Sequence, residues 1–133
     1  MSTKTKMNLG LMKRHELPVD DFIIDGTEID NVLDFDAIGK KVTARLTELL
    51  PLKETVAIVP SYDGDVRVTV NSLQADVDIY ITGLTAVTIA VLNWLAGVDL
   101  NGHSVRFMHY DRDSGAYVPQ VYQATTTVPV SAV

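Results

Sequence analysis

The sequence predicts one α/β domain, and two observations support this prediction. The chain has 133 residues, 47% of them hydrophobic, which is enough for a single hydrophobic core. Its β-type and helical stretches follow one another as strand–helix–strand twice over, with a hairpin inserted. We therefore expect a single small Rossmann-like domain, with a mixed sheet of about six strands, two main helices and an extended N-terminal arm. The expected divisions are an arm over 1–30, the α/β domain over 31–122 and a tail over 123–133.

The first half of the domain predicts a strand, a helix and a hairpin. "NVLDF" at 31–35 is a short strand candidate, and apolar residues at helical spacing predict a helix from 36 to 50. Asp34 or Asp36 is suited to cap this helix, and Pro51 ends it. The β-branched runs at 55–60 and 66–70 flank an Asp-Gly turn, so they predict a hairpin. The apolar residues at helical spacing are Ile38, Val42, Leu46, Leu49 and Leu50.

The second half predicts a strand at 77–82, a helix from 84 to 95 and a final hairpin. The helix has almost no polar face, so we expect it to be covered on more than one side, either deep in the domain or in a subunit interface. "VRFMHY" at 105–110 and "AYVPQVY" at 116–122 predict the final hairpin. Pro119 cannot donate a hydrogen bond, so the second strand of that hairpin belongs at an edge of the sheet or carries a bulge.

Composition narrows the classes of function. The chain has no cysteine, and the most apolar run is too short to cross a bilayer, so we expect a cytoplasmic protein without membrane contact. The net charge is −6: residues 1–14 hold four basic residues and no acid, whereas residues 15–36 hold eight acids and no Lys or Arg. This balance argues against extended binding of DNA or RNA. It leaves room for a small anion held by one or two arginines.

Motifs for the common catalytic and cofactor chemistries are missing from the sequence. The three histidines, His15, His103 and His109, have no metal-ligand spacing, so we expect no metal site. There is no nucleophile elbow, no dinucleotide fingerprint and no phosphate-binding lysine loop, so we assign no catalytic residue and no cofactor. If the protein is an enzyme, a metal-independent nuclease that acts on a cyclic oligonucleotide is the expected class.

The segment "IYITGLTAVTIAVLN" at 79–93 is the strongest candidate for a binding site. It leads from a strand through a glycine into a helix, where free backbone amides and the helix dipole suit a phosphate or carboxylate. Thr82, Gly83 and Thr85 are the candidate ligand-binding residues there. The alternative is that Gly83 is simply the corner of a compact strand-to-helix turn.

The last third of the domain resembles a known family. Leu92-Asn93, Tyr110-Asp111 and Tyr117-Val118-Pro119 match the end of the Rossmann-like sensor domains of the CARF/SAVED type, found in CRISPR and related antiviral systems. The resemblance covers about 45 residues. It implies a domain that binds a cyclic oligonucleotide and often dimerises, and some related small proteins cleave or sequester that messenger.

Three residues of the final hairpin join the candidate site. Tyr110 and Tyr117 are suited to stack on bases, and Arg112 to pair with phosphate, although all three are also ordinary hairpin residues. The leading hypothesis is therefore a small binding module for a nucleotide-type second messenger, forming a homodimer or higher homo-oligomer. The alternative is a structural, self-assembling subunit of a homo-oligomer or of a phage or cellular assembly, with no small-molecule site. Its support is the apolar helix and the uncharged, β-prone tail.

Overall fold

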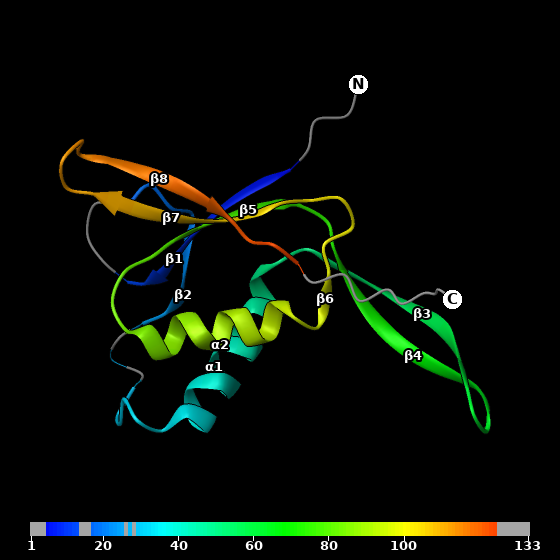
Figure 1. The fold of residues 1–133 in the computed structure, drawn as a ribbon. Coiled ribbons are helices and arrows are strands. Elements are labelled where there is room, and N and C mark those ends of the chain that lie inside the picture. Colours follow the sequence, from blue (N-terminus) through cyan, green and yellow to red (C-terminus); the bar gives the residue numbers. More distant parts are fainter. Residues whose placement is uncertain (1–4, 14–16, 26, 28, 125–133) are drawn as a thin grey trace.

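The main body of the protein is a five-stranded sheet with strand order β2-β1-β5-β7-β8 (Figure 1). The computed structural model describes residues 5–13, 17–25, 27 and 29–124. Neighbouring strands are parallel except for the last pair, in which β8 runs antiparallel to β7. The strands are β1 Lys6–Met12, β2 Asp21–Ile24, β5 Asp76–Tyr80, β7 Val105–Asp111 and β8 Ala116–Val121.

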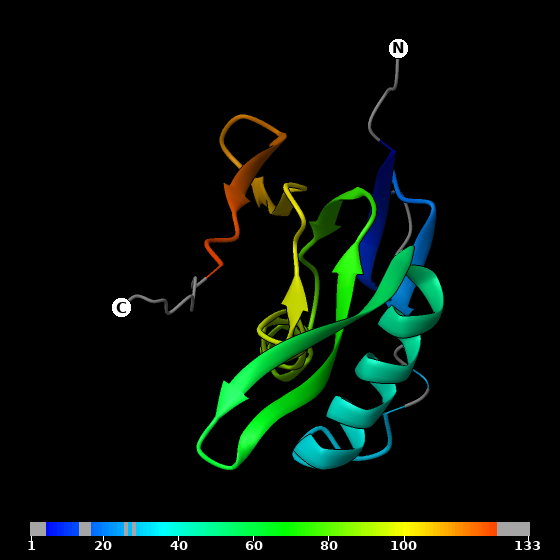
Figure 2. The ribbon, with the colours of Figure 1, turned by 90° about the vertical axis from the view of Figure 1, so that its right-hand side faces the viewer.

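Two helices, α1 (Phe35–Leu49) and α2 (Thr85–Leu95), pack side by side on one face of this sheet (Figures 1 and 2). Each presents one apolar stripe to the strands, because its buried residues recur at spacings of three or four. The core between the helices and the sheet is aliphatic. It includes Leu9, Leu11, Ile38, Val42, Leu46, Val77, Ile79, Val87, Val91 and Val105.

A second, three-stranded sheet contains β3 (Leu52–Ser61), β4 (Gly64–Leu73) and β6 (Val98–Asp99). β3 and β4 form a long antiparallel hairpin, and β6 pairs with β4 only at its base. Beyond that base the hairpin projects away from the rest of the molecule (Figures 1 and 2). We call its projecting part, residues 54–70, the β3–β4 arm.

The predicted α/β class is confirmed, but the number of strands is larger than predicted. Eight strands in two sheets form within the described residues, where about six in one sheet were expected. The difference comes mainly from the N-terminal segment. The prediction of an arm over 1–30 is wrong for Lys6–Met12 and Asp21–Ile24, because β1 lies between β2 and β5 and buries Leu9 and Leu11. These short strands show no sustained alternation of apolar and polar residues, so the sequence gives no strand signal there. The position of β1 is fixed by its pairing with neighbours on both sides.

The predicted strand at 31–35 is also wrong. Residues 31–34 form a turn, and Phe35 is the first residue of α1. The turn is stabilised by the Asn31 side chain, which accepts a hydrogen bond from the Leu33 amide, so the apolar pair Val32-Leu33 is exposed and not in a sheet. The predicted tail falls mostly on 125–133, which lies outside the described residues, as does 1–4.

The other predicted elements are confirmed with small changes of their bounds. The two main helices, the inserted hairpin and the strand before Gly83 all form. β8, which contains Pro119, is an edge strand, as the proline predicts. The expectation for α2 holds only in part: Val87, Val91 and Leu95 are buried, but Ile89 and Leu92 on its other side are exposed. None of the helices in the described part of the chain is long and apolar enough to cross a membrane.

Replacing Asp34 by Ala should destabilise the protein by about 1 kcal/mol, because Asp34 caps α1. Its Oδ1 accepts a hydrogen bond from the Ala37 amide at 3.2 Å, which satisfies one of the free N–H groups of the first turn. Urea unfolding measures the loss. Asp36→Ala is the matched control, since Asp36 lies in the same turn without capping it; an equal loss in both variants would contradict a capping role.

Candidate functional site

The carboxyl ends of the parallel strands lie at one edge of the five-stranded sheet. β5 and β7 are direct neighbours there, so the turn that follows Tyr80 and the turn that follows Asp111 lie at the same edge (left in Figure 1). The six candidate ligand-binding residues lie in these two turns, in the strands beside them or, for Thr85, at the first position of α2. Pairing of two segments about thirty residues apart therefore brings the candidate residues to one edge.

Gly83 has a backbone conformation that side chains rarely adopt. Its φ is +85°, and a Cβ built on it would lie 2.5 Å from Sδ of Met12. The same methionine binds the turn through two hydrogen bonds: the Leu84 amide donates to its Sδ at 3.4 Å, and the Thr82 hydroxyl donates to its carbonyl oxygen at 3.3 Å. Backbone conformation and packing on Met12 are thus sufficient reasons for glycine at this position.

The first turn of α2 has no side-chain cap. The N-cap residue is Leu84, which has no polar side chain, and neither Thr82 nor Thr85 replaces it. Gly83 and Thr85 are exposed, so this helix end faces solvent. An uncapped, exposed helix start presents N–H groups and the positive end of the helix dipole. The chemistry expected from the sequence at this turn is therefore compatible with its geometry.

Three tyrosines form an aromatic cluster on the face of the sheet opposite the helices. The ring of Tyr117 packs edge-to-face against Tyr80, with centroids 4.8 Å apart, and against Tyr110, with centroids 5.4 Å apart. Tyr110 is 57% exposed, so part of the cluster faces solvent. Tyr80, at the end of β5, thus brings the strand before the Gly83 turn into contact with β8. The sequence alone did not indicate a role for Tyr80.

Arg112 lies in the tight turn between β7 and β8. Asp111 fixes this turn: its carboxylate accepts hydrogen bonds from the Ser114 hydroxyl at 2.8 Å and from the Asp113 amide at 3.1 Å. These two hydrogen bonds lower the pKa of the Asp111 carboxyl below its usual value. Arg112 itself is exposed, and no carboxylate of the described residues forms an ion pair with it. Its guanidinium is therefore available to an anionic ligand.

A charged cluster lies on the same open face of the sheet, nearer the amino ends of the strands. Asp78 of β5 binds Arg106 of β7 through two hydrogen bonds, of 2.9 and 2.8 Å, and binds the Lys6 ammonium of β1 at 2.8 Å. The Asp78 side chain is only 5% exposed. Burial by itself raises the pKa of this carboxyl, but the hydrogen bonds from Arg106 and Lys6 outweigh it and hold the pKa below its usual value.

A hollow of about 340 Å³ lies on the helix side of the sheet, between α2 and the β7–β8 pair. Its walls include Ile81, Leu92 and Phe107, and its polar groups include Thr88 and His109. Nε2 of His109 lies 2.8 Å from Oε1 of Gln120, so this exposed histidine already has a partner on the neighbouring strand. We therefore assign it no acid–base role.

The site thus combines predicted and missed residues. Sequence reasoning found the two turns but missed Tyr80, Met12 and the Asp78 cluster. The alternation Asp76, Asp78, Tyr80 is a signal for one polar and aromatic face of β5, and that alternation could have found two of them. Met12 carried no such signal, because its contact with Gly83 joins residues about seventy positions apart.

Neither metal-ligand chemistry nor similarity to known proteins assigns a function to this edge of the sheet. No group of three or more potential metal ligands occurs among the residues that the structure describes. The chain matches no family model, no curated protein and no solved structure. A function for this protein is therefore inferred from the geometry of the site and from the short resemblance in the last third of the domain.

Proposed function

We propose that this protein is a Rossmann-like binding module that recognises a nucleotide-type second messenger, of the cyclic-oligonucleotide class, at the carboxyl edge of its five-stranded sheet. One observation carries the proposal: the strand that leads into the Gly83 turn and the hairpin that holds Arg112 lie side by side at that edge, with Tyr80 of β5 in edge-to-face contact with Tyr117 of β8. By its resemblance to the CARF/SAVED type, the module would act in antiviral defence.

The residues at the edge suit the two chemical parts of such a messenger. Bases stack on aromatic rings, and each stacked base contributes about 1–3 kcal/mol in known single-stranded complexes. Tyr110 offers an exposed ring for this contact. Tyr117 packs against Tyr110, and Tyr80 packs against Tyr117. Phosphates bind guanidinium groups and helix N-termini, and Arg112 and the uncapped start of α2 supply one of each.

The topology supports a ligand at this edge and not at the opposite one. In open α/β sheets, ligands bind outside the carboxyl ends of the strands, where the connecting turns leave backbone groups exposed. β1, β5 and β7 all end at this edge.

Thermal unfolding in the presence of mononucleotides, dinucleotides and cyclic oligonucleotides tests the proposal. A ligand present at about 100 times its Kd adds about 2.7 kcal/mol to stability, which raises Tm by several degrees for a domain of this size. Arg112→Ala should weaken binding by about 1.5–3 kcal/mol, roughly 10- to 100-fold. Arg67→Ala, which removes an exposed arginine from the β3–β4 arm, is the matched control.

Two results would overturn the proposal: a Tm that no member of the panel shifts, or equal binding by the Arg112→Ala variant and the wild type. Chromatography of the nucleotide after incubation in a chelating buffer separates binding from cleavage. Recovery of the intact ring supports a binding module, whereas linear products would identify a metal-independent nuclease.

A structural subunit is the second candidate function, and the β3–β4 arm favours it. Two-stranded hairpins are marginal on their own in water, yet this one projects with Val56 and Ile58 about 60% exposed. Projecting apolar arms are typical of chains that complete their fold in an assembly. The nucleotide panel distinguishes the two functions, because only the binding module should respond to it.

A further inference from the structure

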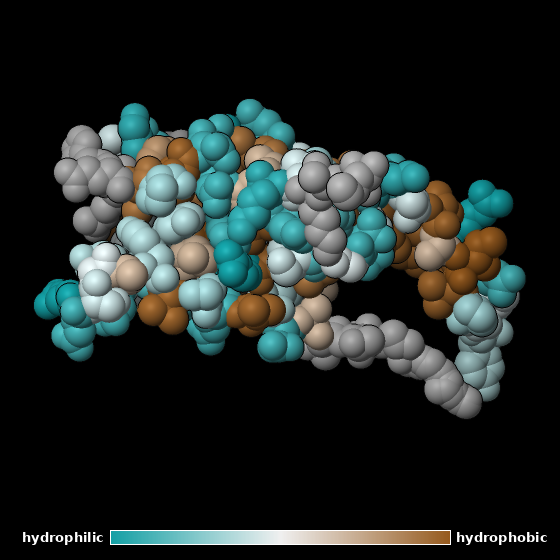
Figure 3. Space-filling model, turned by 90° about the horizontal axis from the view of Figure 1, so that it is seen from above, coloured by the Kyte–Doolittle hydropathy of each residue, from teal (hydrophilic) through white to brown (hydrophobic). Residues whose placement is uncertain are grey.

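We infer that the β3–β4 arm docks in the groove between α1 and α2 of a second copy of this chain. The inference depends on the arm and the groove alone, so it stands or fails independently of the proposed ligand site. Hydrophobic side chains gather at the arm end of the molecule (right in Figure 3). A partner that covers this part of the arm must therefore be apolar. The chain itself has an apolar surface of this kind, the groove between α1 and α2.

One face of the arm is uncharged over its whole length. The register pairs Ala57 with Val68 and Val59 with Val66, and the pair Thr55–Val70 completes the same face. Val59, Val66 and Val68 are 41–47% exposed. The opposite face is mixed: it carries Val56 and Ile58, which are about 60% exposed, but also Arg67 across from Ile58 and Asp65 across from Pro60. The uncharged face is thus the one suited to a dry contact.

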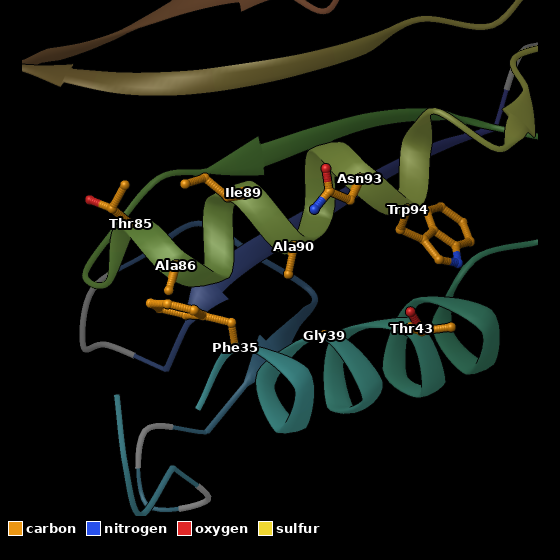
Figure 4. A pocket seen from close by; sticks show the side chains of 9 residues that line it. All are labelled: Phe35, Gly39, Thr43, Thr85, Ala86, Ile89, Ala90, Asn93 and Trp94. Atoms are coloured by element: carbon orange, nitrogen blue, oxygen red, sulfur yellow. The ribbon is translucent and has the colours of Figure 1, made fainter. Parts of the chain in front are cut away.

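The groove between the helices is uncharged as well. It has a volume of about 630 Å³ and is lined by exposed or half-buried residues of α1 and α2. Figure 4 shows Ala86 and Ala90 of α2 directed toward α1, with the Phe35 ring beside Ala86 and Trp94 at the far end. Phe35 is 63% exposed and Ile89 is 52% exposed, so two large apolar side chains of the groove face solvent in the single chain.

The arm is long enough to cover the groove. From Thr85 to Trp94 the groove follows nine helical steps, about 14 Å at a rise of about 1.5 Å per residue. From Thr55 to Ser61 the arm's uncharged face follows six strand steps, about 20 Å at about 3.4 Å per residue. An arm laid along the groove would therefore cover it from end to end.

Charged residues lie at the ends of the two surfaces. Asp63 and Asp65 lie at or beside the tip of the arm, and Lys40 lines the hollow next to Phe35 and Gly39 together with Asp36. A tip that reaches this end of α1 would bring its carboxylates toward the Lys40 ammonium group, with the Asp36 carboxylate on the same hollow. Reciprocal docking between two copies covers two arms and two grooves, so all these exposed side chains would be buried in one dimer.

Disulfide trapping tests the inference, because the chain has no cysteine of its own. Val68→Cys places a thiol on the uncharged face of the arm, and Ala90→Cys places one in the groove. The two variants, one enlarged by a tag, are mixed and oxidised. We expect a tagged–untagged disulfide dimer in the mixture. Arg67→Cys, on the opposite face of the arm, is the matched control and should cross-link to Ala90→Cys at least tenfold less.

Three results would overturn the inference. Equal cross-linking by Arg67→Cys would mean random collision, and efficient cross-linking of Val68→Cys with itself would mean that arms pack on each other. A strict monomer at micromolar concentration in sedimentation would exclude any docking between copies. The Val68→Asp variant is a second test. Val68 is exposed in the single chain, so the variant should keep its circular dichroism spectrum. It should lose the dimer, because the change puts a charge on the uncharged face of the arm.

Discussion

Gly83→Ala is expected to destabilise the protein by about 2–4 kcal/mol. A left-handed backbone conformation costs a residue with a Cβ about 1–2 kcal/mol, and the φ of +85° imposes that cost here. The new Cβ also overlaps Sδ of Met12; overpacking costs about 1–3 kcal/mol, and the low end applies here because the flexible methionine side chain can shift. That shift weakens the hydrogen bond that the sulfur accepts from the Leu84 amide. Urea unfolding monitored by circular dichroism measures the loss.

Gly115→Ala is the matched control for Gly83→Ala. Gly115 also has a positive φ, +70°, but nothing lies within 4 Å of a Cβ built on it, so only the backbone cost of about 1–2 kcal/mol applies. The difference between the two variants isolates the contact with Met12. In a double-mutant cycle, Met12→Ala should cost less in the Gly83→Ala background than in the wild type. Equal losses in the two glycine variants would contradict the contact.

Asp78→Asn is expected to destabilise the protein by about 3 kcal/mol near pH 7, because it leaves two cations facing a neutral amide at a buried position. Asp21→Asn is the matched control. Asp21 binds Arg45 at the same 2.8 Å, but its side chain is 46% exposed, and such a pair contributes at most about 1 kcal/mol. Similar losses in both variants would show that burial of Asp78 does not matter.

The effect of Asp78→Asn should depend on pH in a defined direction. The folded-state pKa of Asp78 is lowered, so its carboxylate stabilises the fold above the unfolded-state pKa of about 3.9 and loses that contribution as pH falls through the folded-state value. The difference in unfolding free energy between wild type and variant should therefore be constant from about pH 7 to about pH 5 and shrink below about pH 4. A difference that stays constant into the acid range would contradict the lowered pKa.

The sequence alone predicted the elements whose signals are local. The spacing of Ile38, Val42 and Leu46 predicted α1, and the Asp-Gly turn between two β-branched runs predicted the hairpin, because these patterns depend on residues a few positions apart. Pro119 predicted an edge strand for the same reason: the missing N–H is a property of one residue. Most of the wrong predictions lie in the first 35 residues. There β1 forms because β2 and β5 pair with it, and no local pattern encodes that pairing.

The same division applies to the site and to the arm. Thr82, Gly83 and Thr85 were found from the strand–glycine–helix pattern, and Tyr110, Arg112 and Tyr117 from the hairpin pattern. Strand pairing alone decided three other contacts. Tyr80 packs against Tyr117, and Met12 fills the space beside Gly83. Lys6 and Arg106 both bind Asp78. Likewise, sequence predicted a β-branched hairpin, whereas the tertiary structure left its uncharged face uncovered. Local chemistry determines which element forms, but contacts between residues far apart in the chain depend on the packing of the whole fold.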